Sequence, residues 1–286
     1  MTPSPATAVR QSLLVAMLLC IGRAPAVAQS VAIAPQMIVV DASTNASAIT
    51  LVNQGDSPAE VSLSTEYGYP ATDSAGAMFL QTFPTVDDTT PSAAPWIQIF
   101  PERLHLAPHA RRTVRLLVTP PAAHPLPQRE YWARLIVAAR AAAPPHTIPG
   151  DTGAIQVGLS LEVRSILPIF YRKGHPATGV LIDSARTAVH ADSLVARARL
   201  TRTGTGAFIG SLTATLQDAH GTAVAQGVLP LGVYYTLTPR VPMSLHGVRP
   251  GTYTLVLDAV GTRPDVSPEL LLHAASVQTT LPVTIQ

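Results

Sequence analysis

Residues 155–163 alternate between apolar and non-apolar side chains without a break. The apolar positions are Ile155, Val157, Leu159, Leu161 and Val163. Successive side chains of a β-strand point to opposite faces, so the alternation predicts a strand with one continuous apolar face. The strand is expected to run on through residues 164–172 and to close one domain before a second begins. If it lies at the edge of a sheet, its free N–H and C=O groups would recruit other strands unless something covers them.

Two interpretations of this strand stay open on periodicity alone. An alternating strand of this length suits the interior of a β-sandwich, where its apolar face is buried within the molecule. Periodicity favours this interior position. The alternative is an edge used for strand addition, in which backbone hydrogen bonds hold a guest strand and pockets between alternate side chains select it.

The first 28 residues have the features of a secretory signal peptide. Arg10 precedes an apolar run, residues 13–21, and the sequence Ala26-Val27-Ala28 before Gln29 fits a small-x-small cleavage site. The run is too short for a spanning helix, and no later segment approaches the required length. We therefore predict an exported chain that does not insert into the membrane after its signal peptide is cleaved.

The charge of the remaining chain excludes some classes of partner. Removing residues 1–28 takes away Arg10, Arg23 and the single cysteine, Cys20, and leaves 258 residues with 17 basic and 17 acidic side chains. An exported protein of this composition does without disulfides. The neutral balance and the lack of a basic cluster along the sequence argue against nucleic acid and against anionic membrane surfaces as partners.

Short runs rich in valine and threonine, separated by turn residues, predict an all-β protein. No stretch keeps a helical period over several turns, and the alanine-rich residues 138–143 run into Pro144-Pro145, which indicates a strand end entering a loop. The length suits two domains. We expect two immunoglobulin-like β-sandwiches, at residues 29–172 and 173–286. Pro35 interrupts the first strand and predicts an edge position or a switch between sheets.

Several of these signals together resemble a known family. A proline and spaced leucines precede a turn and a strand with the pair Val114-Arg115, then a strand that begins at Tyr131, and finally the alternating strand, which ends in Leu167-Pro168-Ile169-Phe170-Tyr171-Arg172. This succession, across most of residues 31–172, resembles the PapD-like periplasmic chaperones of the chaperone–usher route. The second domain carries weaker signals of the family.

The resemblance implies an L- or boomerang-shaped pair of sandwiches and a role in pilus or fimbrial assembly in the periplasm. In that role the strand from Ile155 to Val163 completes a pilin-like fibre subunit by donor-strand complementation, and an outer-membrane usher receives the subunit.

The resemblance fails at the two basic positions that grip the guest's terminal carboxylate in the family. The arginine position falls at Met37, or at Gln36 if the alignment slips, and the lysine position falls at Pro168. Three interpretations follow: binding through the strand alone, anchoring by a nearby cation, or loss of the activity with retention of the fold. The candidate anchors are Arg164, Arg172 and Lys173. The resemblance also places Arg172 at the domain junction, as a partner in an interdomain ion pair.

Residue patterns that would indicate an enzyme are not found in the sequence. The nine histidines show no pair at metal-ligand spacing with a supporting carboxylate, and there is no nucleophile elbow or glycine-rich phosphate loop before a helix. Asp87-Asp88 is better explained as a solvated loop tip than as a cation site. We therefore expect no catalysis, no metal and no cofactor. The alternative to a chaperone is a secreted structural or adhesive protein of two sandwiches, in which the alternating strand is buried.

Overall fold

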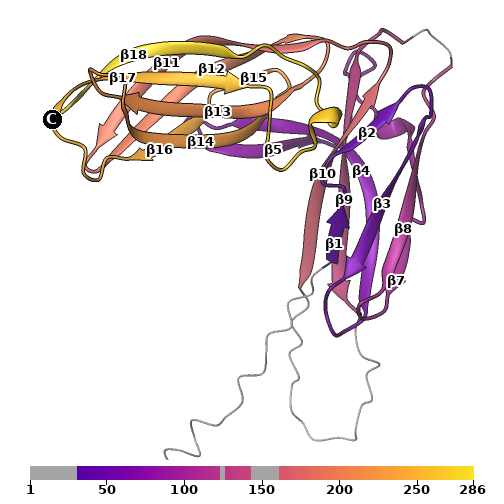
Figure 1. Cartoon of the computed structure of the whole chain (residues 1–286). Helices are drawn as coiled ribbons and strands as arrows, with labels where there is room; N and C mark the ends of the chain where they lie inside the picture. Colours follow the sequence, from indigo (N-terminus) through magenta and orange to yellow (C-terminus); the bar gives the residue numbers. More distant parts are fainter. Residues whose placement is uncertain (1–30, 123–125, 143–160) are drawn as a thin grey trace, which may run out of the picture.

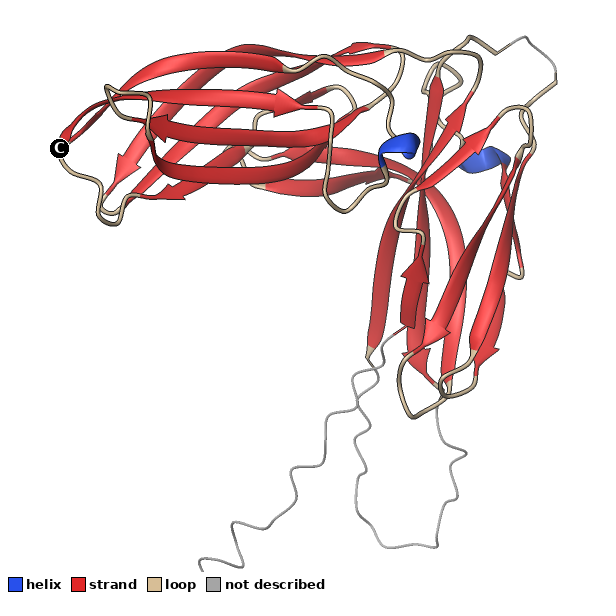
Figure 2. Ribbon diagram, in the orientation of Figure 1, coloured by secondary structure: helices blue, strands red, loops and turns tan. Residues whose placement is uncertain are grey.

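A computed structural model describes residues 31–122, 126–142 and 161–286. Two β-sandwiches meet in an L, and strands make up nearly all of the regular structure (Figures 1 and 2). The only helical elements in the described ranges are two single 3₁₀ turns, η1 (Ala94–Trp96) and η2 (Pro268–Leu270). The predicted all-β class with two sandwiches is confirmed. The predicted signal peptide lies outside the described residues.

The N-terminal sandwich packs a sheet of four strands against a sheet of six. The first has the order β1 (Val31–Ala34), β3 (Ala46–Asn53), β8 (Arg111–Val118) and β6 (Ile97–Phe100). The second has the order β2 (Ile38–Asp41), β10 (Glu162–Arg172), β9 (Glu130–Ala141), β4 (Ala59–Thr72) and β5 (Met78–Phe83), and β7 (Arg103–Leu106) also pairs with β4.

The first stretch of chain is divided between the two sheets. β1 pairs antiparallel with β3 in one sheet, and β2 pairs parallel with β10 in the other. Pro35 lies between them and follows a cis peptide bond. A proline cannot donate a ladder hydrogen bond, which suits a point where the chain leaves one sheet for the other. Of the two alternatives predicted at Pro35, an edge position or a switch between sheets, the structure shows the switch.

The C-terminal sandwich packs two sheets of four strands. One contains β11 (Thr178–His190), β12 (Ser193–Gly204), β15 (Thr236–Leu237) and β16 (Arg240–Ser244), with β12 paired to all the others. The other has the order β14 (Ala223–Val233), β13 (Phe208–Gln217), β17 (Gly251–Val260) and β18 (Val277–Ile285).

Each sandwich has its own apolar core, and a third cluster joins them. The buried members of this third cluster are Met37, Tyr67, Trp132 and Phe170 from the N-terminal sandwich and Ala207 and Tyr234 from the C-terminal one. Its aromatic rings are in contact; for example, the centroids of Trp132 and Tyr234 lie 4.9 Å apart in an edge-on arrangement. We call this cluster the junction core. It fixes the two sandwiches against each other with buried surface as well as with polar contacts.

Candidate functional site: a free edge beside the domain junction

Strand β10 is paired along its whole length on one side and only in part on the other. Antiparallel pairing with β9 covers Glu162–Arg172, whereas parallel pairing with β2 covers only Ile169–Arg172. Within the described parts of the chain, residues 162–168 therefore have no strand on the side away from β9 (Figure 1). This segment is the free edge that an added strand would need. We call it the open edge.

The backbone groups that face away from β9 can be assigned from one hydrogen bond. The carbonyl oxygen of Arg172 accepts from the N–H of Ala42, 3.0 Å away on the β2 side. Backbone groups alternate sides along a strand, so the groups of Glu162, Arg164, Ile166 and Pro168 face the open side too. Pro168 has no N–H to donate. Because its backbone nitrogen faces the open side and not β9, the hydrogen-bond ladder between β10 and β9 stays complete.

The apolar row of the strand leaves the core as it approaches the open edge. Leu167, Ile169 and Tyr171 are buried in the N-terminal core. Val163 and Leu161 continue the same face by the pleat, but 41% and 63% of their surfaces are exposed. Large apolar side chains exposed side by side mark a surface that a partner can cover.

The structure places only part of the predicted binding row. Ile155, Val157 and Leu159 lie outside the described residues, so their role stays a prediction. Leu161 and Val163 are placed, and both are exposed beside the open edge. Ile166, on the opposite face of β10, is 44% exposed as well. The periodicity treated that face as the non-apolar one and therefore missed this residue.

The candidate anchor Arg164 lies on the open edge itself. Its Nε is 2.6 Å from Oε1 of Glu162, and this hydrogen bond raises the pKa of the Arg164 guanidinium. Both side chains are well exposed to solvent. Exposed pairs of this kind contribute little to stability, so Arg164 can exchange its partner at small cost.

The other two candidate anchors lie at the junction. Lys173 directly follows β10, and its backbone N–H donates to the carbonyl of Arg129, 3.1 Å away. Arg172 is held by an ion pair, with its Nε 3.0 Å from Oε1 of Glu130. Glu130 begins β9 of the same sandwich, so the interdomain ion pair that the resemblance implied is wrong, and among the described residues only a hydrogen bond of Arg172 crosses to the other sandwich. Arg172 Nη2 donates to the carbonyl of Leu270 in the C-terminal sandwich, 2.7 Å away. A guest carboxylate would have to displace Glu130 from Arg172.

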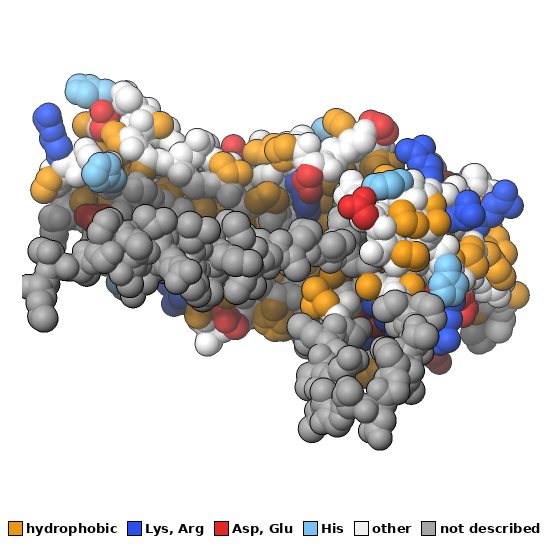
Figure 3. Space-filling view, turned by 90° about the horizontal axis from the view of Figure 1, so that it is seen from below, with side chains coloured by type: hydrophobic (Ala, Val, Ile, Leu, Met, Phe, Trp, Pro, Cys, Tyr) orange, Lys and Arg blue, Asp and Glu red, His pale blue; other side chains and the backbone are white. Residues whose placement is uncertain are grey.

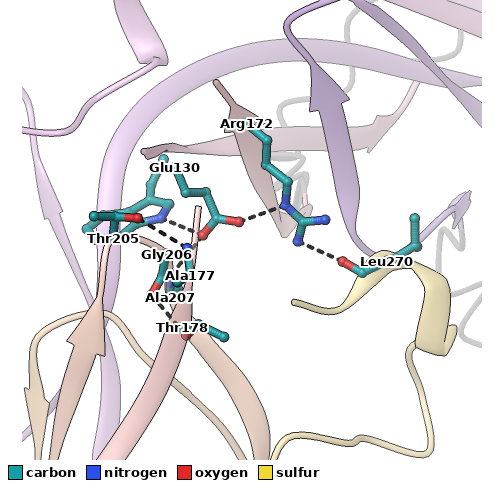
Figure 4. Close-up of polar contacts among 9 residues, drawn as sticks. Glu130, Arg172, Ala177, Thr178, Thr205, Gly206, Ala207 and Leu270 are labelled. Atoms are coloured by element: carbon teal, nitrogen blue, oxygen red, sulfur yellow. Dashed lines mark hydrogen bonds and ion pairs between the residues drawn. The ribbon is translucent and has the colours of Figure 1, made fainter. Parts of the chain in front are cut away.

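Glu130 is the centre of the polar contacts at the junction (Figure 4). Its side chain is 1% exposed, and besides Arg172 it accepts from Trp132 Nε1 and from the backbone N–H of Ala207, each at 2.9 Å. A buried carboxylate is tolerated only when it is paired and hydrogen-bonded. Because Ala207 and Leu270 belong to the second sandwich, these contacts join both halves. We call Glu130, Arg172 and their partners the junction latch.

A short turn presents the N–H of Ala207 to Glu130. The N–H groups of Thr205 and Gly206 both donate to the carbonyl of Ala177, at 2.8 and 2.9 Å, and the hydroxyl of Thr178 donates to the carbonyl of Gly206 at 3.0 Å (Figure 4). Gly206 allows this close approach, because a Cβ there would lie 2.4 Å from a methyl carbon of Leu272.

The two positions that are basic in the family have different surroundings here. Met37 is 5% exposed and packs in the junction core. Pro168 pairs across the strands with Arg134 of β9, which is also 5% exposed. Arg134 Nε donates to the carbonyl of Gly68 at 2.9 Å, and its guanidinium carbon lies 4.8 Å from the ring centroid of Tyr234.

Sequence reasoning missed Arg134, although a signal was present. A charged residue in the apolar strand Tyr131-Trp132-Ala133-Arg134-Leu135 is unusual and indicates a buried partner. In the structure that partner is largely an aromatic face, and Nη2 has no hydrogen-bond acceptor among the described residues.

Arg202 adds further positive charge at the junction. Its Nε donates to the carbonyl of Tyr234 at 2.6 Å, and its guanidinium lies 5.6 Å from the ring of Trp132. Burial lowers the pKa of Arg202, and the nearby charge of Arg129 lowers it further. The junction therefore holds four arginines, at positions 129, 134, 172 and 202, near the buried carboxylate of Glu130. Three of them, Arg129, Arg134 and Arg202, also lie over aromatic rings, which interact favourably with their positive charge.

The described residues contain neither a metal-binding cluster nor a membrane-spanning helix. No group of three or more acidic, histidine or cysteine side chains is arranged to hold a metal ion there. No helix in the described ranges has the length and apolar character that a membrane crossing requires. Viewed from below, hydrophobic side chains are interspersed with charged and polar ones (Figure 3).

Comparisons with solved structures find fimbrial chaperones, the family that the sequence resembles. The chaperone YadV is 13% identical, with 88% of this chain and 99% of that chain covered and a TM-score of 0.43. The CupB2 chaperone of Pseudomonas aeruginosa is 12% identical, with 89% and 100% covered and a TM-score of 0.39. The SafB chaperone, solved with the SafA pilin of Salmonella enterica, is 13% identical, with 89% and 97% covered and a TM-score of 0.41.

No protein-family model matches the sequence, and no curated protein matches it. Identities this low bear on the fold alone. The description of the fold therefore rests on the strand order and registers of the chain itself.

The junction latch generates a prediction about stability. Glu130→Gln should lower the free energy of unfolding by about 3–5 kcal/mol, because it leaves Arg172 partly buried without its counter-charge. Urea denaturation of the mature chain measures this loss. Glu162→Gln is the matched control, since it removes the carboxylate of an exposed pair and should change stability little. Adding Arg172→Met to Glu130→Gln should recover part of the loss. Equal stability of Glu130→Gln and the control would show that the latch contributes nothing.

The tyrosines of the junction predict a loss of stability in alkali. Burial raises the pKa of Tyr234 to about 12, with Arg134 opposing the rise. Burial and the hydrogen bond to Tyr235, 2.8 Å between hydroxyl oxygens, raise the pKa of Tyr67 well above its ordinary value. Above pH 10 the unfolded chain loses protons that the folded chain keeps, so stability falls as pH rises from 10 toward 12. The slope of the unfolding free energy against pH should become shallower in Tyr234→Phe. An unchanged slope would contradict the assignment.

Proposed function

We propose that this chain is a periplasmic chaperone that holds a pilin-like fibre subunit on its open edge and passes it to an outer-membrane usher. The observation that supports the proposal most is the open edge itself, residues 162–168, where free backbone groups adjoin exposed Leu161 and Val163. A guest strand laid along this edge would gain ladder hydrogen bonds. The apolar row would complete the guest's core in donor-strand complementation.

The proposed role is binding without catalysis. The apolar side chains beside the edge are suited to shield a guest that lacks a strand, because each buried Leu or Val contributes about 1.5–3 kcal/mol before ordering costs. Ile155, Val157 and Leu159, if they extend the row as the alternation predicts, lengthen the face offered to the guest.

The junction latch would keep the open edge ordered in the absence of a guest. Arg172 is the last residue of β10, and its contacts with Glu130 and Leu270 fix that end of the strand to both sandwiches. A strand that is already ordered pays less entropy when a guest binds, which increases affinity.

Among the three candidate anchors, Arg164 suits a guest carboxylate best. It lies on the open edge and its present partner, Glu162, is exposed, whereas Arg172 is committed to the buried Glu130. Lys173 follows the part of β10 that β2 already covers. We therefore assign the anchoring role to Arg164, in place of the family positions at Met37 and Pro168.

Capture of the subunit tests the edge. The mature chain is co-expressed in a periplasm with the pilin-like product of a neighbouring gene, and the tagged chain is purified and its companions identified by mass. Leu161→Glu should abolish the one-to-one complex while the free chain still folds, because Leu161 is 63% exposed. Val228→Glu, which charges a residue 56% exposed on β14 of the other sandwich, should leave capture intact.

Two results would contradict the edge model. If Leu161→Glu unfolds the free chain, the strand is internal and the chain is better explained as a structural or adhesive two-sandwich protein. If the wild-type chain purifies alone while the subunit is degraded, strand donation to that subunit is wrong.

The anchor has its own test in the same assay. Arg164→Gln should weaken capture by about tenfold, because a charge-assisted hydrogen bond to the guest carboxylate is lost. The variant Lys173→Gln should capture the subunit as efficiently as the wild-type chain does. Affinity is measured with purified subunit and chaperone. If only Lys173→Gln binds the subunit more weakly, the anchor is Lys173 at the junction and not Arg164. Equal capture by both variants would show that the strand binds without a charged anchor.

A further inference from the structure

Three arginines form a row across the outer face of one sheet in the C-terminal sandwich. Arg186 of β11 pairs directly with Arg197 of β12, and Arg197 pairs directly with Arg240 of β16. Neighbouring strands lie about 5 Å apart, so three positive side chains stand side by side. Arg199, two residues along β12, adds a fourth on the same face.

The charge of this row is poorly balanced by the protein itself. Like charges directly opposite each other on a sheet are destabilising. In the part of the chain that the structure describes, Arg199 alone of the four makes an ion pair, with its Nε 3.7 Å from Asp183. The sequence lacks a linear basic cluster, so only the register of three strands brings these charges together. Clustered charge of one sign creates a local positive potential, which attracts anions.

The row lines a hollow of the size of a small-ligand site. A hollow of about 380 Å³ is lined by Arg186, Arg197 and Arg240, together with Thr187 and His190. A second hollow of about 330 Å³ shares Arg186 and Arg197 and reaches Arg199. Guanidinium groups recognise phosphate and carboxylate through paired N–H donors, and a concave setting lets several of them act on one ligand.

The middle arginine is held in place from the other sandwich. Arg197 Nη1 donates to the carbonyl of Ser74, 3.0 Å away, in the turn between β4 and β5. The same turn meets the next strand of the row, where the N–H of Arg240 donates to the carbonyl of Gly76 at 3.0 Å. The guanidinium of Arg197 and the backbone of Arg240 are therefore fixed before any ligand arrives, which lowers the entropy cost of binding.

We propose that this arginine row binds a compact anion that carries two or more phosphate groups, either a free phosphorylated molecule or a phosphorylated lipid headgroup. Phosphate fits better than carboxylate because each phosphate carries up to two negative charges. Two phosphates therefore balance the row within one hollow, where three or four carboxylates would be needed. The row stands on β11, β12 and β16 of the second sandwich, whereas the open edge belongs to β10 of the first (Figure 1), and the proposal does not depend on the proposed chaperone function.

Calorimetric titration of the mature chain with inorganic tripolyphosphate at low salt tests the proposal. The variant Arg186→Gln/Arg240→Gln removes the two outer arginines, both exposed and neither in a side-chain ion pair among the described residues. It should weaken binding by about tenfold or more. The control Arg111→Gln/Arg115→Gln removes two exposed arginines from β8 of the other sandwich, so the change in net charge is the same. It should bind as the wild-type chain does.

Further binding measurements test whether the arginine row is specific for phosphate groups. Citrate at the same concentration should bind more weakly than tripolyphosphate. Binding to phosphatidylcholine vesicles is measured with and without a diphosphorylated lipid. Binding that needs this lipid would identify a lipid headgroup as the ligand, whereas binding of tripolyphosphate alone would identify a free anion. An equal loss in both double variants would overturn the site, since net charge alone would then explain binding. The site would also be overturned if the wild-type chain, with its fold verified by circular dichroism, bound neither tripolyphosphate nor the vesicles.

Discussion

The polar contacts at the end of β10 that join the two sandwiches centre on one buried carboxylate. Glu130 would be costly inside the protein by itself, and it is tolerated because Arg172, Trp132 and Ala207 supply a counter-charge and two hydrogen bonds. These partners come from two strands of the first sandwich and a turn of the second. The end of β10, the start of β9 and the turn at Ala207 are therefore set by the same contact, and the open edge takes its position from them.

The sequence predicts the fold well where local patterns decide it. Alternation, prolines and turn residues predicted strands now seen in both sandwiches, the sheet switch at Pro35 and the strand end near Ala141. The polar residues 71–95 are rich in Thr, Ser and Pro, and by composition they predict a loop with short strand material around residues 77–83. In the structure β4 continues to Thr72 and pairs with β5, because the cross-strand partners of the hairpin stabilise it.

The site was only partly predictable because much of it arises from register. Periodicity predicted the apolar row to which Leu161 and Val163 belong, and the family resemblance placed Arg172 at the junction, where the structure has it. Arg134 opposite Pro168, and Arg186 opposite Arg197, become neighbours only when two strands pair in one alignment. A single sequence does not contain that alignment, so neither the cation packed on Tyr234 nor the arginine row could be inferred from it.

The partial cover of β10 by β2 has a geometric consequence for any added strand. β2 occupies the ladder from Ile169 onward, so a visiting chain that pairs with the open edge must stop where Ile38 begins. The protein thus carries a physical end-stop made of its own backbone. If a guest strand binds as proposed, such a stop would limit how far the guest can slide along the open edge and would align it with the apolar row, although Met37 and Pro168 carry no charge.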